Sequence, residues 1–333
     1  MAERHITFRD AVLEALAEEM RADPAVVLIG EDIGAAGGVF LQTKGLFQEF
    51  GPQRVIDTPI SESGIVGMAI GAAMTGLRPV VEIMFGDFIT LAMDQLVNQA
   101  AKVRYMSGGA YTVPLVVRTA IGVGGNLGPQ HSQSFHAWAA HVPGLKVVMP
   151  SCPADAKGLF KAAIRDDDPV VFFESRSSYN AVGAVPDGEH IVPLGRAAVR
   201  REGMDVTIIA VGAAVTTALQ AADALEGEGI SVEVVDVRSL VPLDAEAIVA
   251  SVRKTSRALV LDHGHARFGV TGELAATIAE QAFDHLDAPV ARLAAPDVPI
   301  PFGRSLEPLA QPGQEAIAAK LRALLSRCGC PRP

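Results

Sequence analysis

The chain has 333 residues, 49% hydrophobic and 20% charged, which is long enough for two globular domains and excludes a disordered protein. Its formal net charge of −10, with scattered Lys and Arg, excludes a basic groove for nucleic acid. No uncharged apolar run reaches about 18 residues, so no membrane span is expected. The N-terminus resembles neither a signal peptide nor a transit peptide, and we therefore expect a cytoplasmic protein.

From the N-terminus, compact apolar runs alternate with helical patterns. A helix is expected from Thr7 to about Arg21, because apolar residues recur on one face and Pro24 follows. β-Branched runs predict buried strands at 26–30, 79–85, 114–118, 145–149 and 169–173, and helical patterns lie near 62–76, 87–106 and 153–165. This alternation predicts βαβ units and a mainly parallel sheet.

A second alternating block follows a stretch rich in Gly, Pro, Ser and charged residues. Strands are expected at 206–211, 232–236, 258–262 and 289–293, with helices near 214–227, 243–254, 271–285 and 313–326. The prediction is therefore two α/β domains, at 1–185 and 205–333, joined by an irregular linker at 186–204.

The cysteines predict no disulfide framework and no metal site. They are Cys152, Cys328 and Cys330, and the last two lie in a terminal Cys-Gly-Cys sequence. A spacing of one residue is too short for the usual zinc knuckle, so we interpret this sequence as a frayed terminus.

Ligands bind beyond the carboxyl ends of the strands in open parallel sheets, and four such loops carry polar or aromatic residues. They contain Glu31 and Asp32, then Glu62, then the Phe-Gly-Asp-Phe sequence 85–88, and then a glycine-rich segment that ends at His131. These loops are where we expect a site.

Two interpretations are open for Glu62. As a carboxylate in the first turn of a helix it can simply compensate the helix dipole. However, the helix behind it is apolar almost all round from Ile65 to Ala73 and should be buried, so that a carboxyl group at its start could hold a proton in place.

His131 is either a structural residue near a turn or an oriented catalytic imidazole. Its neighbours Gln130, Ser132 and Gln133 supply donors and acceptors for such an orientation. The glycines before it miss the dinucleotide-binding spacing by one residue, and no G-x-S-x-G sequence is present. Dinucleotide binding and serine hydrolysis are therefore rejected.

Several segments, in their order along the chain, resemble the β subunits of pyruvate, branched-chain 2-oxo acid and acetoin dehydrogenase complexes. They are Thr58-Pro-Ile-Ser-Glu-Ser-Gly64, Gly76-Leu-Arg-Pro79, Met93-Asp-Gln-Leu-Val-Asn-Gln-Ala-Ala-Lys102, Arg104-Tyr-Met-Ser-Gly-Gly109, Gly128-Pro-Gln-His-Ser-Gln133, Pro143-Gly-Leu-Lys-Val-Val148, Ala163-Ile-Arg-Asp166 and Pro296-Asp-Val-Pro-Ile-Pro301. The resemblance implies a transketolase-like pyrimidine-binding domain followed by a transketolase C-terminal domain.

The resemblance also implies a cofactor, thiamine diphosphate, and a role for each site residue. Glu62 matches the glutamate that exchanges a proton with the aminopyrimidine ring, and Phe88 matches the aromatic residue that stacks on it. Glu31 and Ile60 match other members of that pocket, and His131 matches the histidine facing the reacting carbon. Positions around a structural monovalent cation, such as K⁺, in some relatives are matched by Leu115, Ala163, Ile164, Asp166 and Asp168.

The implied reaction is oxidative decarboxylation of a 2-oxo acid, with acyl transfer to a lipoyl acyltransferase core. Pyruvate is the first expectation, and a branched-chain acid or acetoin the second. No Gly-Asp-Gly motif for a Mg²⁺-bound diphosphate is present, so an α subunit in an α2β2 heterotetramer is expected to hold the metal and share the cofactor. Two rivals are a two-chain transketolase-like enzyme acting on sugar phosphates and an inactive scaffold subunit.

Three segments depart from the pattern of the relatives. They are Ser-Arg-Ser-Ser before Tyr179, the compact loop 34–38, and the sequence 266–269, which lacks a doubled glycine. These departures leave the expected cofactor residues in place, and they bear on the substrate and on partner contacts.

Overall fold

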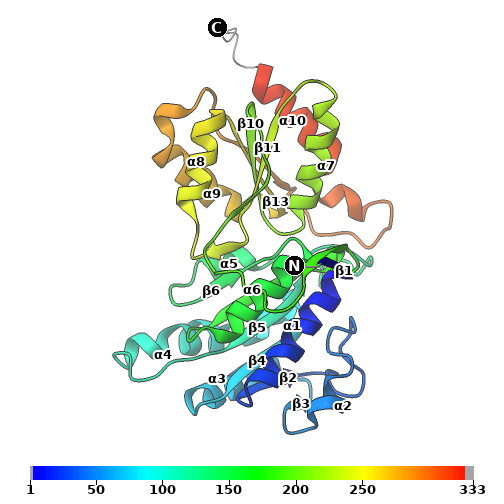
Figure 1. The fold of residues 1–333 in the computed structure, drawn as a ribbon, viewed down its shortest axis with the longest axis vertical. Helices are drawn as coiled ribbons and strands as arrows, with labels where there is room; N and C mark the ends of the chain where they lie inside the picture. The colour runs from blue at the N-terminus through cyan, green and yellow to red at the C-terminus, as the bar shows by residue number, and fades with distance from the viewer. Residues whose placement is uncertain (1–2, 327–333) are drawn as a thin grey trace.

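A computed structural model describes residues 3–326 and shows two α/β units stacked along the long axis of the molecule (Figure 1). The first is built on a seven-stranded sheet, the second on a five-stranded sheet, and β1 (Glu3–Thr7) pairs with β8 (Val182–Pro186) as a separate antiparallel ribbon. The predicted fold of two α/β domains with mainly parallel sheets is confirmed.

The N-terminal sheet has the order β12-β6-β7-β5-β4-β2-β3, and all neighbours except β12 and β6 are parallel. Its strands are β2 (Val26–Gly30), β3 (Val55–Asp57), β4 (Arg78–Phe85), β5 (Val116–Ile121), β6 (Lys146–Val148), β7 (Val170–Ser175) and β12 (Ser239–Val241). Alternate residues of the strands pack on opposite faces, as the pleat requires.

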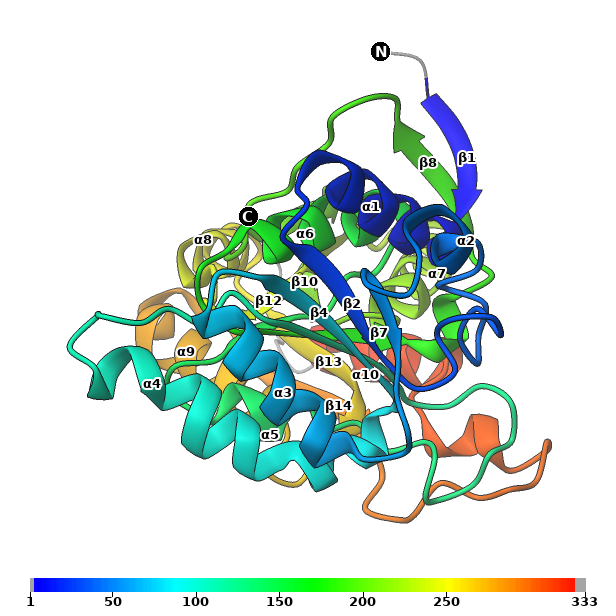
Figure 2. The same cartoon turned by 90° about the horizontal axis from the view of Figure 1, so that it is seen from below.

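Helices cover both faces of this sheet, as Figure 2 shows from below. One face is covered by α1 (Phe8–Ala22) and α6 (Pro153–Arg165), and the other by α3 (Glu62–Met74), the 3₁₀ helix η1 (Gly86–Ala92), the π-helix η2 (Gln95–Ala100) and α4 (Ala101–Met106). The short helices α2 (Leu46–Phe50), α5 (His136–Ala140) and η3 (Arg176–Ser178) lie in loops. The helix start predicted at Thr7 is confirmed, since its hydroxyl accepts a hydrogen bond from the amide of Asp10 at 3.1 Å.

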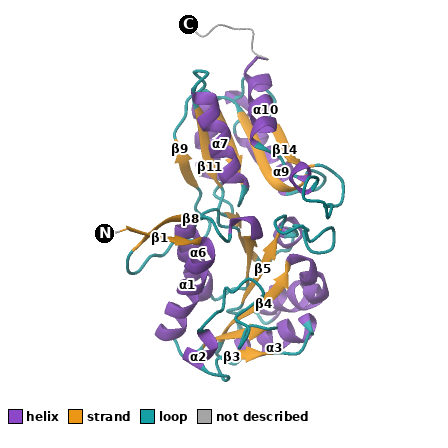
Figure 3. Cartoon of the chain, turned by 90° about the vertical axis from the view of Figure 1, so that its right-hand side faces the viewer, coloured by secondary structure: helices purple, strands orange, loops and turns teal. Residues whose placement is uncertain are grey.

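The C-terminal sheet has the order β14-β13-β10-β11-β9 and lies between two pairs of helices (Figures 1 and 3). Its strands are β9 (Ala198–Arg201), β10 (Val206–Ala210), β11 (Val232–Asp236), β13 (Ala258–His265) and β14 (Ala291–Ala295). The helices α7 (Ala214–Glu226) and α10 (Gln314–Ser326) cover one face, and α8 (Ala245–Thr255) and α9 (Val270–Gln281) cover the other. Two 3₁₀ turns, η4 (Phe283–His285) and η5 (Glu307–Ala310), complete the unit.

Five strands of the described residues were not predicted from the sequence. They are β1, β3, β8, β9 and β12, each of three to five residues. The irregular linker predicted at 186–204 differs from the structure because β9 lies within it and pairs antiparallel with β11. β12 follows the C-terminal strand β11 along the chain, yet it pairs with β6 of the N-terminal sheet. Such short strands have too few residues to show an alternating pattern.

Two predictions about helices were wrong in detail. The single helix expected at 87–106 is divided into 3₁₀, π and α segments. The helix α3 is buried on one face only: Ile65 and Val66 are inside, whereas Met68 is 47% exposed. Its other face stays open in the single chain because none of the described elements covers it there. None of the helices between residues 3 and 326 is long and apolar enough to cross a membrane.

The described residues contain one cysteine, Cys152, whose thiol is free. Burial raises its pKa. Cys328 and Cys330 lie outside the described residues, so the frayed terminus stays a prediction.

Candidate active site

Four predicted site residues follow four neighbouring strands at the carboxyl edge of the N-terminal sheet. β5, β4, β2 and β3 are adjacent in this order, and they lead to His131, Phe88, Glu31 and Glu62 respectively. Parallel pairing places all four loops at the same edge, where open sheets bind their ligands. The sheet therefore lines up the residues that the sequence singled out.

Glu31 and Glu62 form a pair of buried carboxyl groups at one end of this row. Their exposed fractions are 6% and 7%, and the Oε1 atom of Glu31 is buried with no hydrogen-bond partner among the described residues. Burial raises the pKa of Glu31, and the nearby Glu62 carboxylate raises it further. An unpaired buried carboxyl oxygen costs free energy, and a bound group with a hydrogen-bond donor would satisfy it.

The loop that begins at Glu31 is held by Asp57, at the end of the neighbouring strand β3. Its carboxylate accepts hydrogen bonds from the amides of Ile33 at 3.1 Å and Gly34 at 3.3 Å. Gly34 has no room for a side chain, because a Cβ atom there would lie 2.6 Å from Asp57 Oδ2. The compact loop 34–38 is therefore a positioned segment next to the carboxyl pair.

Ile60, expected in the same pocket, is 82% exposed. It lies in the connection between β3 and α3, just before Glu62. Nothing in the described part of the single chain covers this side chain, so its membership of a cofactor pocket stays a prediction.

At the other end of the row, Phe88 and His131 meet in an aromatic cluster with Phe85. The ring centroids are 5.0 Å apart for Phe85 and His131, 5.5 Å for Phe88 and His131, and 5.6 Å for Phe85 and Phe88, all edge to face. Such contacts orient rings and each contribute about 0.5–1.5 kcal/mol. Phe85 lies in the segment 85–88 where the sequence predicted part of the site, but only Phe88 of that segment was given a role.

The loop that carries His131 is anchored by Arg176, another residue that the sequence reasoning missed. Arg176 Nη1 donates to the main-chain oxygen of His131 at 2.6 Å, and Nη2 donates to that of Gly122 at 2.6 Å. Burial lowers the pKa of Arg176. Arg176 belongs to the Ser-Arg-Ser-Ser departure, and its position directly after β7 was the available signal.

Below the site, a buried cluster of charges ties three strands together. Arg118 on β5 donates to Glu82 on β4 at 2.5 Å and to Glu174 on β7 at 2.7 Å. Burial raises the pKa of Glu82 to about 7. Removing one partner would leave an uncompensated buried charge, so we interpret this cluster as structural support for the sheet.

The residues expected around a monovalent cation lie together, but their charged groups already have partners. Asp166 accepts from Lys146 Nζ at 2.7 Å, and Asp168 pairs with Arg104 at 2.5 Å. The main-chain oxygens of Leu115, Ala163, Ile164 and Asp166 each accept at least one hydrogen bond. A carbonyl oxygen has a second lone pair, so the cation stays a prediction that rests on these carbonyls.

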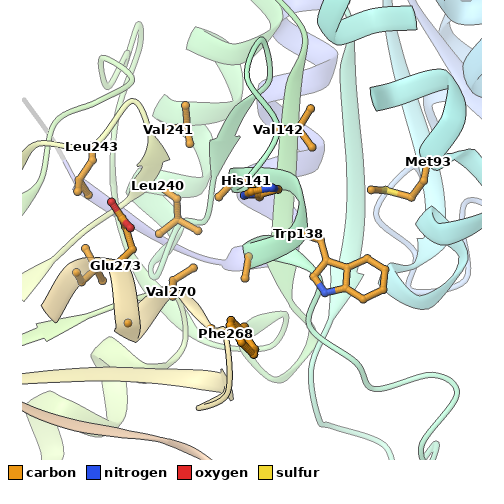
Figure 4. A pocket seen from close by; sticks show the side chains of 15 residues that line it. Met93, Trp138, His141, Val142, Leu240, Val241, Leu243, Phe268, Val270 and Glu273 are labelled. Atoms are coloured by element: carbon orange, nitrogen blue, oxygen red, sulfur yellow. The ribbon is translucent and has the colours of Figure 1, made fainter. Parts of the chain in front are cut away.

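An apolar cleft of about 990 Å³ opens where the two domains meet, and its lining includes none of the predicted site residues (Figure 4). Met93, Trp138 and Val142 line it from the N-terminal domain, and Phe268 and Val270 from the C-terminal domain. Trp138 and Phe268 are exposed. An exposed apolar patch of this kind is typical of a surface that contacts another protein.

Both domains of the chain match domains of known protein families. Residues 4–182 match the transketolase pyrimidine binding domain and residues 195–317 the transketolase C-terminal domain. The β subunit of acetoin:2,6-dichlorophenolindophenol oxidoreductase from Bacillus subtilis (strain 168) is 49% identical, over 97% of this chain and 98% of that one. Subunit beta-2 of the mitochondrial pyruvate dehydrogenase E1 component from Oryza sativa subsp. japonica is 48% identical, over 93% and 84%.

A solved split-gene transketolase, described as an inactive beta4 tetramer, has the same fold. It superposes with a TM-score of 0.78 at 25% identity and covers 96% of this chain and 98% of that chain. The chain therefore belongs to the family of dehydrogenase E1 β subunits, which are built from a transketolase pyrimidine-binding domain and a transketolase C-terminal domain.

Proposed function

We propose that this chain is the β subunit of a thiamine-diphosphate-dependent 2-oxo acid dehydrogenase, with pyruvate as the first expected substrate. The observation that carries the proposal is the row of Glu62, Glu31, Phe88 and His131 along one sheet edge. A buried pair of carboxyl groups at one end and an aromatic cluster with an imidazole at the other fit a planar, nitrogen-containing ring.

The residues present fit the pyrimidine half of the cofactor. When bound, thiamine diphosphate supplies a carbon nucleophile and stores the electron pair left by departing carbon dioxide. Glu62 would hold and move a proton at its carboxyl oxygen, and the buried carboxyl group of Glu31, whose pKa is raised by burial and by Glu62, would lie beside it. Phe88 would lie against the ring, and Ile60 would be covered once the pocket is complete.

The family to which the chain belongs implies an α-type partner. We propose an α2β2 heterotetramer in which the α subunit holds Mg²⁺ and the diphosphate. A solved relative described as an inactive tetramer of β chains supports the expectation that a β chain alone does not turn over. A lipoyl acyltransferase core as acyl acceptor, a K⁺ ion at the site of Leu115, Ala163, Ile164, Asp166 and Asp168, and a cytoplasmic location remain parts of this proposal.

The substrate is tested by reconstituting the chain with its α subunit, thiamine diphosphate and Mg²⁺. Reduction of 2,6-dichlorophenolindophenol would be measured with pyruvate, a branched-chain 2-oxo acid and acetoin. We expect kcat/KM for pyruvate to exceed that for the branched-chain 2-oxo acid by at least about tenfold, the discrimination that one or two methylene groups give. A preference for acetoin would support the second candidate, which the 49% identical relative favours. Turnover of sugar phosphates alone, or of nothing, would contradict the proposal.

His131→Ala is expected to slow acyl transfer to a lipoyl domain by about 10²-fold and to affect turnover with the artificial acceptor less. The reason is that His131 lies on a loop at the rim of the site, whereas the carboxyl pair lies at the other end of the row. Steady-state rates with the two acceptors separate the steps.

His285→Ala is the control, since His285 is exposed on η4 and far along the chain from the site. It should leave both rates unchanged. If His131→Ala lowers both rates equally, His131 serves the earlier chemistry.

A further inference from the structure

The loop 122–133 that carries His131 lies between two oppositely charged side chains from different domains. On one side Arg176 donates to the carbonyl oxygens of Gly122 and His131. On the other side Glu307, on η5 of the C-terminal domain, accepts from the amide of Asn126 at 3.1 Å and from that of Gly124 at 3.4 Å. Carbonyl oxygens thus face the guanidinium and amide hydrogens face the carboxylate.

The loop depends on these contacts for its shape. Gly124, Gly125, Asn126 and Gly128 all have positive φ, at +119°, +114°, +57° and +72°. The segment is glycine-rich and contains no helix or strand, so many other backbone conformations are accessible to it. Groups outside the loop must therefore select one conformation.

The C-terminal domain also packs directly on the loop, three residues before His131. A Cβ atom built on Gly128 would lie 2.5 Å from the ring of Phe302. A cavity of about 420 Å³ next to this contact is lined by Gln130 and Gln133 from the loop and by His265 and Asp297 from the C-terminal domain. The shape of that cavity changes if the loop moves.

We propose that Glu307 is a positioning residue through which the C-terminal domain sets the place of His131. Glu307 is buried, with an exposed fraction of 7%. Among the described residues, its carboxylate accepts hydrogen bonds only from main-chain amides of the loop. This carboxylate holds the loop by charge-assisted hydrogen bonds, which are stronger than neutral ones. The role of His131 in this inference rests on the proposed function. The contact between Glu307 and the loop does not depend on that function.

The test compares Glu307→Ala, Glu307→Gln and the control Glu315→Ala. Glu315 is an exposed carboxylate in the first turn of α10 in the same domain. Hydrogen–deuterium exchange of residues 122–128 is measured in the full chain, and kcat and KM in the enzyme reconstituted with its α subunit. We expect Glu307→Ala to accelerate exchange about tenfold and to lower kcat with the lipoyl acceptor about tenfold, with little change in KM.

Glu307→Gln keeps one acceptor oxygen and should recover most of both losses, whereas Glu315→Ala should match the wild type. Unchanged exchange in Glu307→Ala overturns the proposal, whatever happens to activity. Faster exchange with unchanged kcat overturns the positioning of His131. Hydrogen–deuterium exchange that rises throughout the C-terminal domain in both Glu307 variants also overturns the proposal, and it shows that Glu307 serves domain stability alone.

A wild-type enzyme without dehydrogenase activity would instead contradict the proposed function. The exchange data would still decide whether Glu307 holds the loop.

Discussion

Replacing Glu62 with glutamine is expected to abolish turnover while the fold stays intact, with a loss of at least about 10²-fold in kcat. An amide has the size of the carboxyl group, but it cannot give and take the proton. Glu62 lies buried beside Glu31 at the head of α3, so no solvent-exposed carboxyl group can replace it there. The measurement is kcat of the reconstituted enzyme, together with circular dichroism and the thermal midpoint of the variant.

Glu246→Gln is the matched control. Glu246 also lies in the first turn of a helix, α8, but it is exposed and belongs to the other domain. It tests the alternative that a glutamate at a helix start only compensates the helix dipole. Near-wild-type turnover of a well-folded Glu62→Gln enzyme would contradict the catalytic role of Glu62. Compensation of the helix dipole would then be its remaining role.

Without its α subunit, the chain is expected to bind thiamine diphosphate and Mg²⁺ at least about 10²-fold more weakly than the assembled enzyme, the loss given by one well-placed charged contact. Two aspartates lie next to a glycine, Asp87 and Asp187, and neither is part of a Gly-Asp-Gly motif. Oδ1 of Asp87 accepts from the side chain of Gln133 at 2.8 Å, and Asp187 pairs with Arg4 at 3.3 Å. Over residues 3–326 no three His, Cys, Asp or Glu side chains are grouped so as to hold a metal ion.

Isothermal titration of the chain, alone and with its α subunit, measures this difference. A titration with thiamine alone serves as the control, because it contains the ring and lacks the diphosphate. The isolated chain should show similar weak affinity for both compounds. Tight, Mg²⁺-dependent binding of thiamine diphosphate by the chain alone would show that the diphosphate site is not in another subunit.

The pattern of residues along the chain was sufficient for most strands of both sheets and for their mainly parallel arrangement. Buried β-branched runs predicted β2, β4 and β11 within one residue of their bounds, and amphipathic runs predicted α1 and α6 equally well. These elements are specified locally, because the period of apolar residues matches the period of the backbone. The loops at the carboxyl edge followed from the parallel arrangement, and with them the positions of Glu31, Glu62, Phe88 and His131.

Contacts between distant parts of the chain were decided only by the tertiary structure. β12 pairs with β6 across the domain boundary, and the buried side chains of His136 and Asp262 meet at 2.8 Å across the same boundary. Arg176 and Glu307 reach the His131 loop from residues 54 and 181 positions away along the chain. No local pattern contains such pairings, since they depend on how the two domains pack against each other.

The sequence by itself therefore determined the type and order of most elements and the chemistry available at one sheet edge. Only the tertiary structure decided which groups orient that chemistry, and which apolar faces remain open. The helix α3 illustrates the reason, because its apolar composition predicted burial on all sides, whereas Met68 and the face around it are uncovered. Whether an apolar side chain is buried depends on the surface that packs against it, and a single sequence does not contain that surface.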